Sequence, residues 1–161
     1  MGISVEHRIS LPTLRGNILS GDTPGARLRQ ARLARNMTIK DLAAAAGLSI
    51  ATIGNLESNR THASLPHLRI LAKVLGVPIA FLGCFERLPE NTLGQRITKA
   101  RLYHGLTKKE MAQAMGVNPK TLRGWENDMH QPPRCYITAL IRYLAILVDE
   151  TNANINTPGL L

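Results

Sequence analysis

"TIKDLAAAAGLSIATIGNLES", residues 38–58, returns 69 positions later as "TKKEMAQAMGVNPKTLRGWEN", residues 107–127. The two stretches align without a gap and are identical at seven positions: Thr38/Thr107, Lys40/Lys109, Ala43/Ala112, Ala45/Ala114, Gly47/Gly116, Thr52/Thr121 and Glu57/Glu126. A repeat of this length in a chain of 161 residues favours two small domains over a single larger one.

Each copy predicts a helix, a tight turn and a second helix. The first helix opens with the capping-box spacing of a threonine and an acid three residues later, Thr38 with Asp41 and Thr107 with Glu110. A glycine suited to the left-handed conformation ends it, Gly47 or Gly116. A new helix cap follows two residues later, Ser49 or Asn118. This order predicts a helix-turn-helix in each copy.

Apolar spacing indicates which sides of these helices are buried. Leu42 and Ala45 are expected to face inward from the first helix of the first copy. In the second helix of each copy the inward residues are expected to be Ile53 and Leu56, or Leu122 and Trp125. The remaining positions of these second helices then form an outer face.

Positive charge is concentrated in the repeats. Lys and Arg number 20 in the whole chain, against 11 Asp and Glu. Residues 24–60 contain six basic and two acidic side chains and residues 92–130 contain seven and three, which gives each segment a net charge of +4. A basic surface that occurs twice favours a polyanion such as nucleic acid as the partner.

Other features narrow the class of protein. The two cysteines lack CxxC spacing, which favours reduced thiols and a cytoplasmic location. The longest apolar run, around 137–148, is interrupted by Arg142 and is too short to span a bilayer. Histidine and cysteine spacing does not match a metal site, and no phosphate loop or nucleophile motif occurs. We expect no metal, no cofactor, no membrane association and no enzymatic activity.

The pattern resembles the XRE-family (Cro/C1-type, lambda-repressor-like) helix-turn-helix domain, present twice. Each copy has an arginine in the preceding helix, then T-x-x-[DE]-[LM]-A, a Gly-[LV] turn and T-[IL]-x-x-[LW]-E. The resemblance runs from Gly25 to about Leu82 and from Leu93 to about Leu147. It implies an all-α fold of two tandem five-helix domains joined by a short linker, and binding to double-stranded DNA.

The repeat also sets the expected domain boundaries. We expect an N-terminal arm over residues 1–22, a first helix-turn-helix domain over 23–83, a linker over 84–91, a second domain over 92–150 and a C-terminal tail over 151–161. The connecting segment from Gly83 to Thr92, about ten residues, spans at most ~33–36 Å when extended. The linker either stretches between the domains or, since Phe85 and Leu88 are apolar, packs against them.

The second helix of a helix-turn-helix reads bases in the major groove. The base-reading candidates are therefore Ile50, Ala51, Thr52 and Asn55 in the first copy and Lys120, Thr121 and Arg123 in the second. Long cations suit guanine, whereas the outer face of the first copy suits a thymine methyl group and one adenine.

Phosphate contacts are expected from free N–H groups at helix starts and from nearby cations. The candidates are Arg27, Thr38, Ser49, Arg60, Thr107, Lys108 and Asn118. After the reading helix the first copy has Asn59-Arg60, which suits a phosphate, whereas Asp128 in the second copy would repel one. Whether both copies contact DNA fully is therefore left open.

The resemblance further implies two largely buried ion pairs that join the first helix of each domain to the third. They are Arg32 with Glu57 and Arg101 with Glu126. We expect these residues to stabilise the domains rather than to read bases.

The functional prediction is a sequence-specific transcriptional regulator, and specifically a repressor, with two readers in adjacent major grooves. The alternative is an antitoxin-like protein-binding regulator, in which one repeat is an interaction module with an apolar face around Ile50 and Ala51. The last helix is apolar on two sides, which predicts contacts with its own domain and with either the first domain or a second chain. A homodimer through this helix is one expectation.

Overall fold

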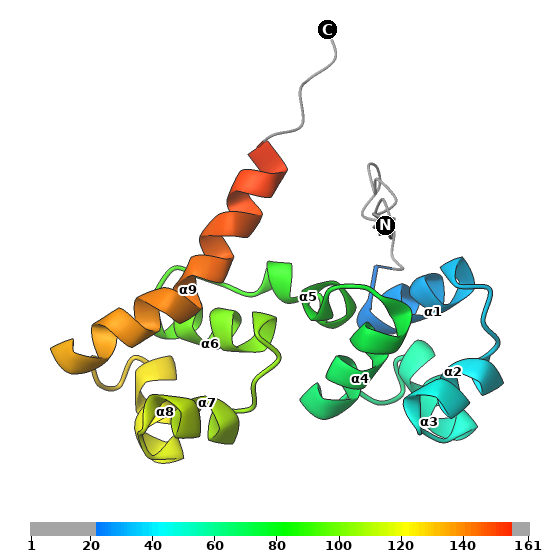
Figure 1. Ribbon diagram of the computed structural model, residues 1–161, viewed down its shortest axis with the longest axis horizontal. Coiled ribbons are helices and arrows are strands. Elements are labelled where there is room, and N and C mark those ends of the chain that lie inside the picture. Colours follow the sequence, from blue (N-terminus) through cyan, green and yellow to red (C-terminus); the bar gives the residue numbers. More distant parts are fainter. Residues whose placement is uncertain (1–21, 156–161) are drawn as a thin grey trace, which may run out of the picture.

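The computed structural model describes residues 22–155, and the regular secondary structure in this part of the chain is all helical. The first repeat comprises α1 (Pro24–Ala34), α2 (Ile39–Ala46), α3 (Ile50–Glu57), α4 (Leu65–Leu75) and α5 (Ile79–Gly83). The second comprises α6 (Leu93–Tyr103), α7 (Lys108–Met115), α8 (Pro119–Glu126) and α9 (Arg134–Ile155). Figure 1 shows the two repeats as neighbouring helical units. The predicted arm at 1–22 lies outside the described residues except for Asp22, whereas residues 151–155 of the predicted tail at 151–161 form the end of α9.

The predicted caps position the helix-turn-helix units. Thr38 Oγ1 accepts a hydrogen bond from the Asp41 amide at 3.1 Å, and Asp41 Oδ2 accepts one from the Thr38 amide at 2.8 Å. The same reciprocal pair opens α7. Gly47 and Gly116 end α2 and α7 with φ of 65° and 67°, a conformation that a residue with a Cβ adopts at a cost. The turn between the two helices therefore has the same geometry in both repeats.

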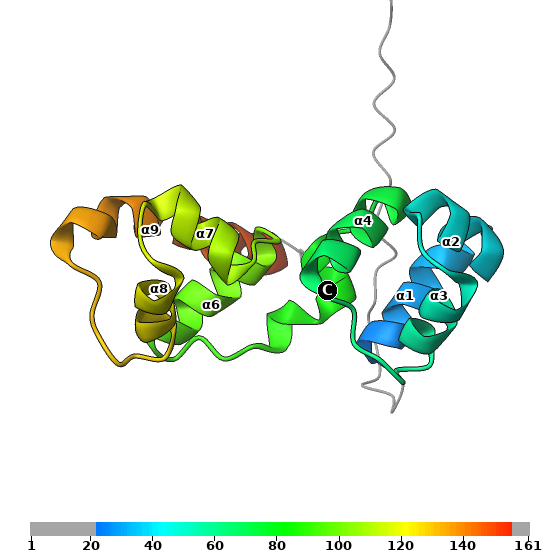
Figure 2. The same ribbon diagram turned by 90° about the horizontal axis from the view of Figure 1, so that it is seen from below.

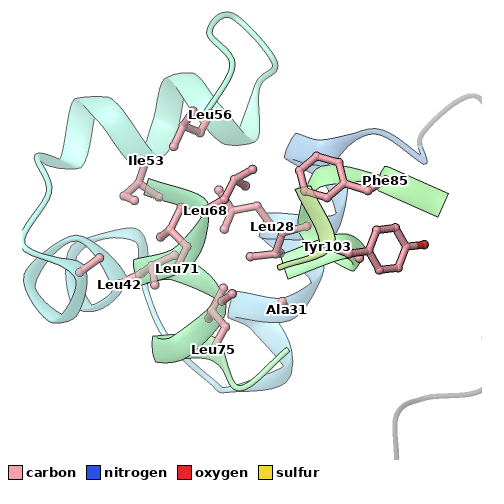
Figure 3. Packing of buried hydrophobic residues seen from close by; sticks show 14 of the residues in the cluster. Leu28, Ala31, Leu42, Ile53, Leu56, Leu68, Leu71, Leu75, Phe85 and Tyr103 are labelled. Carbon is pink, nitrogen blue, oxygen red and sulfur yellow. The ribbon is translucent and has the colours of Figure 1, made fainter. Parts of the chain in front are cut away.

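Each repeat has its own apolar core. Leu42, Ile53 and Leu71 are fully buried in the first, where Figure 3 shows them converging from α2, α3 and α4. In the second core the fully buried side chains include Ile97, Met111 and Leu122. One expectation about burial was wrong: α2 buries Leu42, Ala43 and Ala46, whereas Ala45 is exposed. The helix is rotated toward Ala43 because α3 and α4 both pack against that side.

The second repeat has four helices within the described residues, rather than the five predicted. In the first repeat Gly76, with φ of 65°, ends α4, and α5 begins after Pro78. The aligned residues in the second repeat are Ala145 and Leu147, which do not interrupt a helix. The chain therefore continues as one 22-residue helix, α9.

The segment between the repeats is packed rather than stretched. Residues Phe85–Arg87 form a 3-10 helix, η1, and Phe85 is buried in the core of the first repeat. From the second repeat, Ala100, Tyr103 and Leu147 join that same core. Part of α9 thus covers the first repeat, which is one of the two partners expected for its second apolar side.

Candidate nucleic-acid interface

The two helix-turn-helix units lie along the same edge of the molecule. In Figure 1 the α2–α3 pair and the α7–α8 pair both lie at the lower edge, and Figure 2 views the molecule from below, onto that edge. Helix α9 lies above the α7–α8 pair, and α4 lies beside the α2–α3 pair, toward the middle of the molecule. Helices α3 and α8 therefore lie along the same edge.

Helices α3 and α8, which carry the base-reading candidates, present different chemistry on their outer faces. On α8, Lys120, Thr121 and Arg123 are all exposed. On α3, Ile50 is 55% exposed and Ala51 is exposed, whereas Asn55 is only half-buried. Two long cations on α8 thus correspond to small or apolar side chains on α3.

Thr52, the fourth candidate on α3, is less available than its sequence position indicates. Its amide donates to Ser49 Oγ at 3.0 Å, and its hydroxyl oxygen lies 2.8 Å from the same Ser49 oxygen. Ser49 and Thr52 therefore satisfy one another at the start of α3. The equivalent cap in α8 is made by Asn118, whose Oδ1 accepts from the Lys120 amide at 2.9 Å.

Both ion pairs implied by the resemblance are present. Arg32 holds both carboxylate oxygens of Glu57, with Nε–Oε1 at 2.6 Å and Nη2–Oε2 at 2.9 Å. The hydrogen bonds that Arg32 donates to the Glu57 carboxylate raise the pKa of Arg32, and they outweigh burial, which disfavours its charged form. Arg32 also donates to the Met37 carbonyl at 2.7 Å, which holds the α1–α2 turn.

The pair in the second repeat has a different geometry. Arg101 Nε lies 2.5 Å from Glu126 Oε1, but Glu126 Oε2 receives no hydrogen bond from any described residue. Lys108 Nζ lies 3.3 Å from Oε2. Lys108 is about half exposed, so it lies between a buried carboxylate and solvent. Lys108, a phosphate candidate, thus also neutralises the charge of Glu126.

Arg27 does not present its charge to solvent, contrary to its inclusion among the phosphate candidates. Its guanidinium bonds to Asp22 Oδ1 at 2.7 Å, to Glu86 Oε1 at 2.5 Å and to the Phe81 carbonyl at 2.9 Å. The residue is 9% exposed, and its hydrogen bond to Asp22 raises its pKa. The aligned Arg96 is exposed instead. We therefore leave Arg27 out of the interface proposed below.

Asn59 and Asp128 also have internal partners. Asn59 Oδ1 accepts from the Gly25 amide at 3.0 Å, and Asp128 Oδ1 accepts from the Gly94 amide at 2.9 Å. Asn59 follows α3 and Asp128 follows α8, both with φ of 55°. Each holds the start of the repeat's first helix, also through a hydrogen bond with Thr23 or Thr92. The acid at 128 is thus the structural counterpart of the amide at 59, and Arg60 corresponds to Met129.

Sequence reasoning missed one pair of exposed cations. Lys40 and Lys109 occupy the second position of α2 and α7 and are exposed in both repeats. Their side chains project from helix N-termini, where anions are favoured. The signal was available, because the lysine is among the seven positions identical between the copies.

A family model described as Helix-turn-helix matches the chain twice, over residues 28–82 and 97–149. The chain belongs to the XRE-type helix-turn-helix family. Comparison of this tandem XRE-type protein with the curated proteins and with the solved structures gave no match. Its family is one of DNA-binding transcriptional regulators, and the all-helical fold with two such domains agrees with the expectation from the sequence.

The described helices also bear on membrane association. Within residues 22–155, no helix of this XRE-type protein is both long and apolar enough to cross a bilayer. The partner that the family implies is double-stranded DNA.

Proposed function

We propose that this protein is a sequence-specific repressor that places α3 and α8 in adjacent major grooves of one duplex. The observation that carries the proposal is the position of both helix-turn-helix units along one edge of a single packed chain. A dimer of single-domain readers achieves the same with two subunits, because successive major grooves on one face of DNA repeat every ~34–36 Å. A protein that covers two grooves excludes other proteins from them, which favours repression. It would act on DNA in the cytoplasm.

The exposed side chains support an asymmetric site. Lys120 and Arg123 on α8 can donate to guanine O6 and N7, whereas Ile50 and Ala51 on α3 suit the methyl group of thymine. Asn55 is the residue of α3 suited to adenine. Since the two faces differ, the two halves of the operator should differ, and the site need not be a palindrome.

Backbone contacts would supply most of the affinity. We assign them to the exposed cations Lys40, Arg60, Lys108 and Lys109 and to the amides at the helix starts capped by Thr38, Ser49, Thr107 and Asn118. The caps use the side-chain oxygens of these four residues, so the first-turn N–H groups are what a phosphate would meet.

The test is selection from a randomised duplex pool, followed by sequencing. The wild type should enrich a two-part motif with its halves about one helical turn apart. The Lys120→Ala/Arg123→Ala variant should lose one half and Asn55→Ala should weaken the other. If only one half is ever enriched, the first repeat is not a reader.

One observation favours a second function for the first repeat. Helix α3 carries no basic residue and exposes Ile50, so its outer face also suits an apolar protein partner, as in an antitoxin-like regulator. Salt dependence separates the two functions, because DNA binding through several phosphates weakens steeply with salt and an apolar interface does not.

We also propose self-association through α9. Ile137, Ile141 and Val148 lie at helical spacing on one side of α9 and are 37%, 59% and 53% exposed. Leu140 and Leu147, on other sides, are buried against the two repeats. A second copy presenting the same stripe would cover it. Sedimentation showing only a 17.6 kDa species at micromolar concentration would reject the homodimer.

A further inference from the structure

The two repeats are joined by an apolar contact as well as by the chain. Tyr103, the last residue of α6, is 8% exposed and belongs to the core of the first repeat, where Figure 3 shows it beside Phe85. The turn after Tyr103 also lies close to the first repeat, because a Cβ added at Gly105 would lie 3.1 Å from Arg69 Cγ and from Ile79 Cδ1. The second repeat therefore rests against α4 and α5.

Polar contacts surround this apolar centre. Arg69 Nη1 on α4 donates to Glu110 Oε1 on α7 at 2.8 Å. Lys99 on α6 is 7% exposed, and its Nζ donates to the Glu86 carbonyl at 3.2 Å and lies 3.3 Å from Glu90 Oε2. A buried lysine satisfied in this way fixes α6 against the linker, because moving it would leave an unpaired charge.

Two of these contacts come from positions at which the repeats differ. The first-repeat counterparts of Lys99 and Tyr103 are Gln30 and Ala34, and both are exposed. Ala100 and Glu110 are shared with the first repeat as Ala31 and Asp41, whereas Lys99 and Tyr103 are specific to the second. The junction is thus an addition to the repeated unit and not a by-product of it.

We propose that this junction fixes the position of α8 relative to α3, so that the protein accepts only one spacing between the halves of its site. Tyr103 and Arg69 are then spacing-determining residues that touch no base. The inference rests on the proposed two-groove function. Each base pair inserted between the halves moves one half by ~3.4 Å and turns it by about a tenth of a helical turn. A flexible tether would absorb such a change, and a packed junction does not.

The experiment measures affinity for the selected site with its halves moved closer or apart by one and two base pairs. The wild type should lose at least about tenfold in affinity for a change of one base pair, because only one reader can then engage. Tyr103→Ala should bind all five spacings within about threefold of one another, because its tether no longer fixes the readers.

A charge-reversal pair guards against a variant that fails to fold. Arg69→Glu sets a carboxylate against Glu110, and the Arg69 side chain is 39% exposed, so both cores remain intact. Lys73→Glu is its matched control, since Lys73 is exposed on the same helix and the change in charge is identical. Arg69→Glu should broaden the accepted spacing and Lys73→Glu should not. A wild type that tolerates all spacings, or equal broadening in both variants, overturns the proposal.

NMR relaxation of the backbone amides distinguishes failure of this inference from failure of the proposed function. In the free wild type, the backbone amides of both repeats should fit one rotational diffusion tensor, and in Tyr103→Ala they should need two. If selection enriches no two-part motif, the two-groove function fails, and with it the spacing proposal. If the motif appears but the repeats tumble independently, the function stands and the fixed junction is rejected.

Discussion

The two repeats share a frame and differ on their surfaces. In both, a capping box opens the first helix of the helix-turn-helix, α2 or α7, and a glycine with positive φ ends it. An Arg–Glu ion pair joins the first helix of each repeat to the third, and an Asn or Asp side chain accepts a hydrogen bond from the backbone at the start of the repeat. The outer faces diverge: Lys120 and Arg123 of α8 align with Ala51 and Gly54 of α3. A repeated sequence therefore specifies a repeated scaffold, on which each copy can carry a different reading surface.

Identical residues do not always keep identical roles. Arg27 is held by Asp22, Glu86 and the Phe81 carbonyl, whereas the aligned Arg96 is exposed. The difference arises because α5 packs beside α1 and η1 supplies Glu86, whereas in the second repeat α9 packs beside α6 in place of α5. The last helices of the two repeats, which differ, thus decide what a shared residue does.

The largest expected effect comes from breaking the shared frame. Glu57→Gln and Glu126→Gln each leave a buried arginine without its charge partner, which should lower the free energy of unfolding by about 3–5 kcal/mol. Urea unfolding followed by circular dichroism reports both repeats, and fluorescence of Trp125, the chain's single tryptophan, reports the second. Unchanged unfolding together with altered base preference would show that these acids read DNA instead.

The close approach of the first and third helices gives the next effect. A Cβ at Gly25 would lie 2.6 Å from the Glu57 carbonyl oxygen, and one at Gly94 would lie 2.5 Å from that of Glu126. Gly25→Ala and Gly94→Ala should each destabilise by about 1–3 kcal/mol, as overpacking does. Gly54→Ala is the control, because a Cβ there meets nothing within 4 Å and should stabilise α3 by about 0.5–1 kcal/mol. Equal effects at all three glycines would refute the close-approach argument.

A smaller effect would test the difference in charge between α2 and α7. Lys108 of α7 aligns with Ile39 of α2, so only the second repeat has a cation there. Lys108→Ala should reduce the slope of log affinity against log salt by about 1. Arg142→Ala, an exposed cation on α9 outside the helix-turn-helix, should leave the slope unchanged. If both variants change the slope equally, Lys108 is general surface charge and not a phosphate ligand.

The smallest effect concerns the capping acids and pH. Hydrogen bonds from the Thr107 amide and then from Arg69 lower the pKa of Glu110 from 4.5 to about 2. The hydrogen bond from Thr38 lowers the pKa of Asp41 as well, but Asp41 has no arginine partner among the described residues. Stability from a depressed carboxyl is fully present above its unfolded pKa of 4.5 and is lost as pH falls toward about 2. Unfolding of the wild type and Glu110→Gln at several pH values should therefore converge toward pH 2.

The matched comparison for that experiment is Asp41→Asn in the first repeat. Its difference from the wild type should also shrink on acidification, but by less, because Asp41 lacks a counterpart of Arg69. A larger pH effect at Asp41 than at Glu110 would contradict the ranking of the two caps.

Local sequence signals determined the helix-turn-helix units. Capping boxes, left-handed glycines and apolar spacing act within a few residues of one another, so their structural effect follows from the sequence alone. The second repeat also shows how far such signals reach. Ala145 and Leu147 stand where Gly76 and Pro78 interrupt the first repeat, and the continuous α9 could have been read from that exchange.

The sequence by itself therefore determined that this protein has two copies of one DNA-binding scaffold, with two basic residues on the last helix of the second helix-turn-helix and none on that of the first. Only the tertiary structure decided that Arg27 bonds within the protein, that Lys108 forms an ion pair with the buried Glu126, and that Tyr103 and Arg69 join the repeats. The physical reason is that these roles depend on partners distant in the sequence: Glu86 is 59 residues from Arg27, and Glu110 is 41 residues from Arg69. No local pattern records which distant group a side chain will meet.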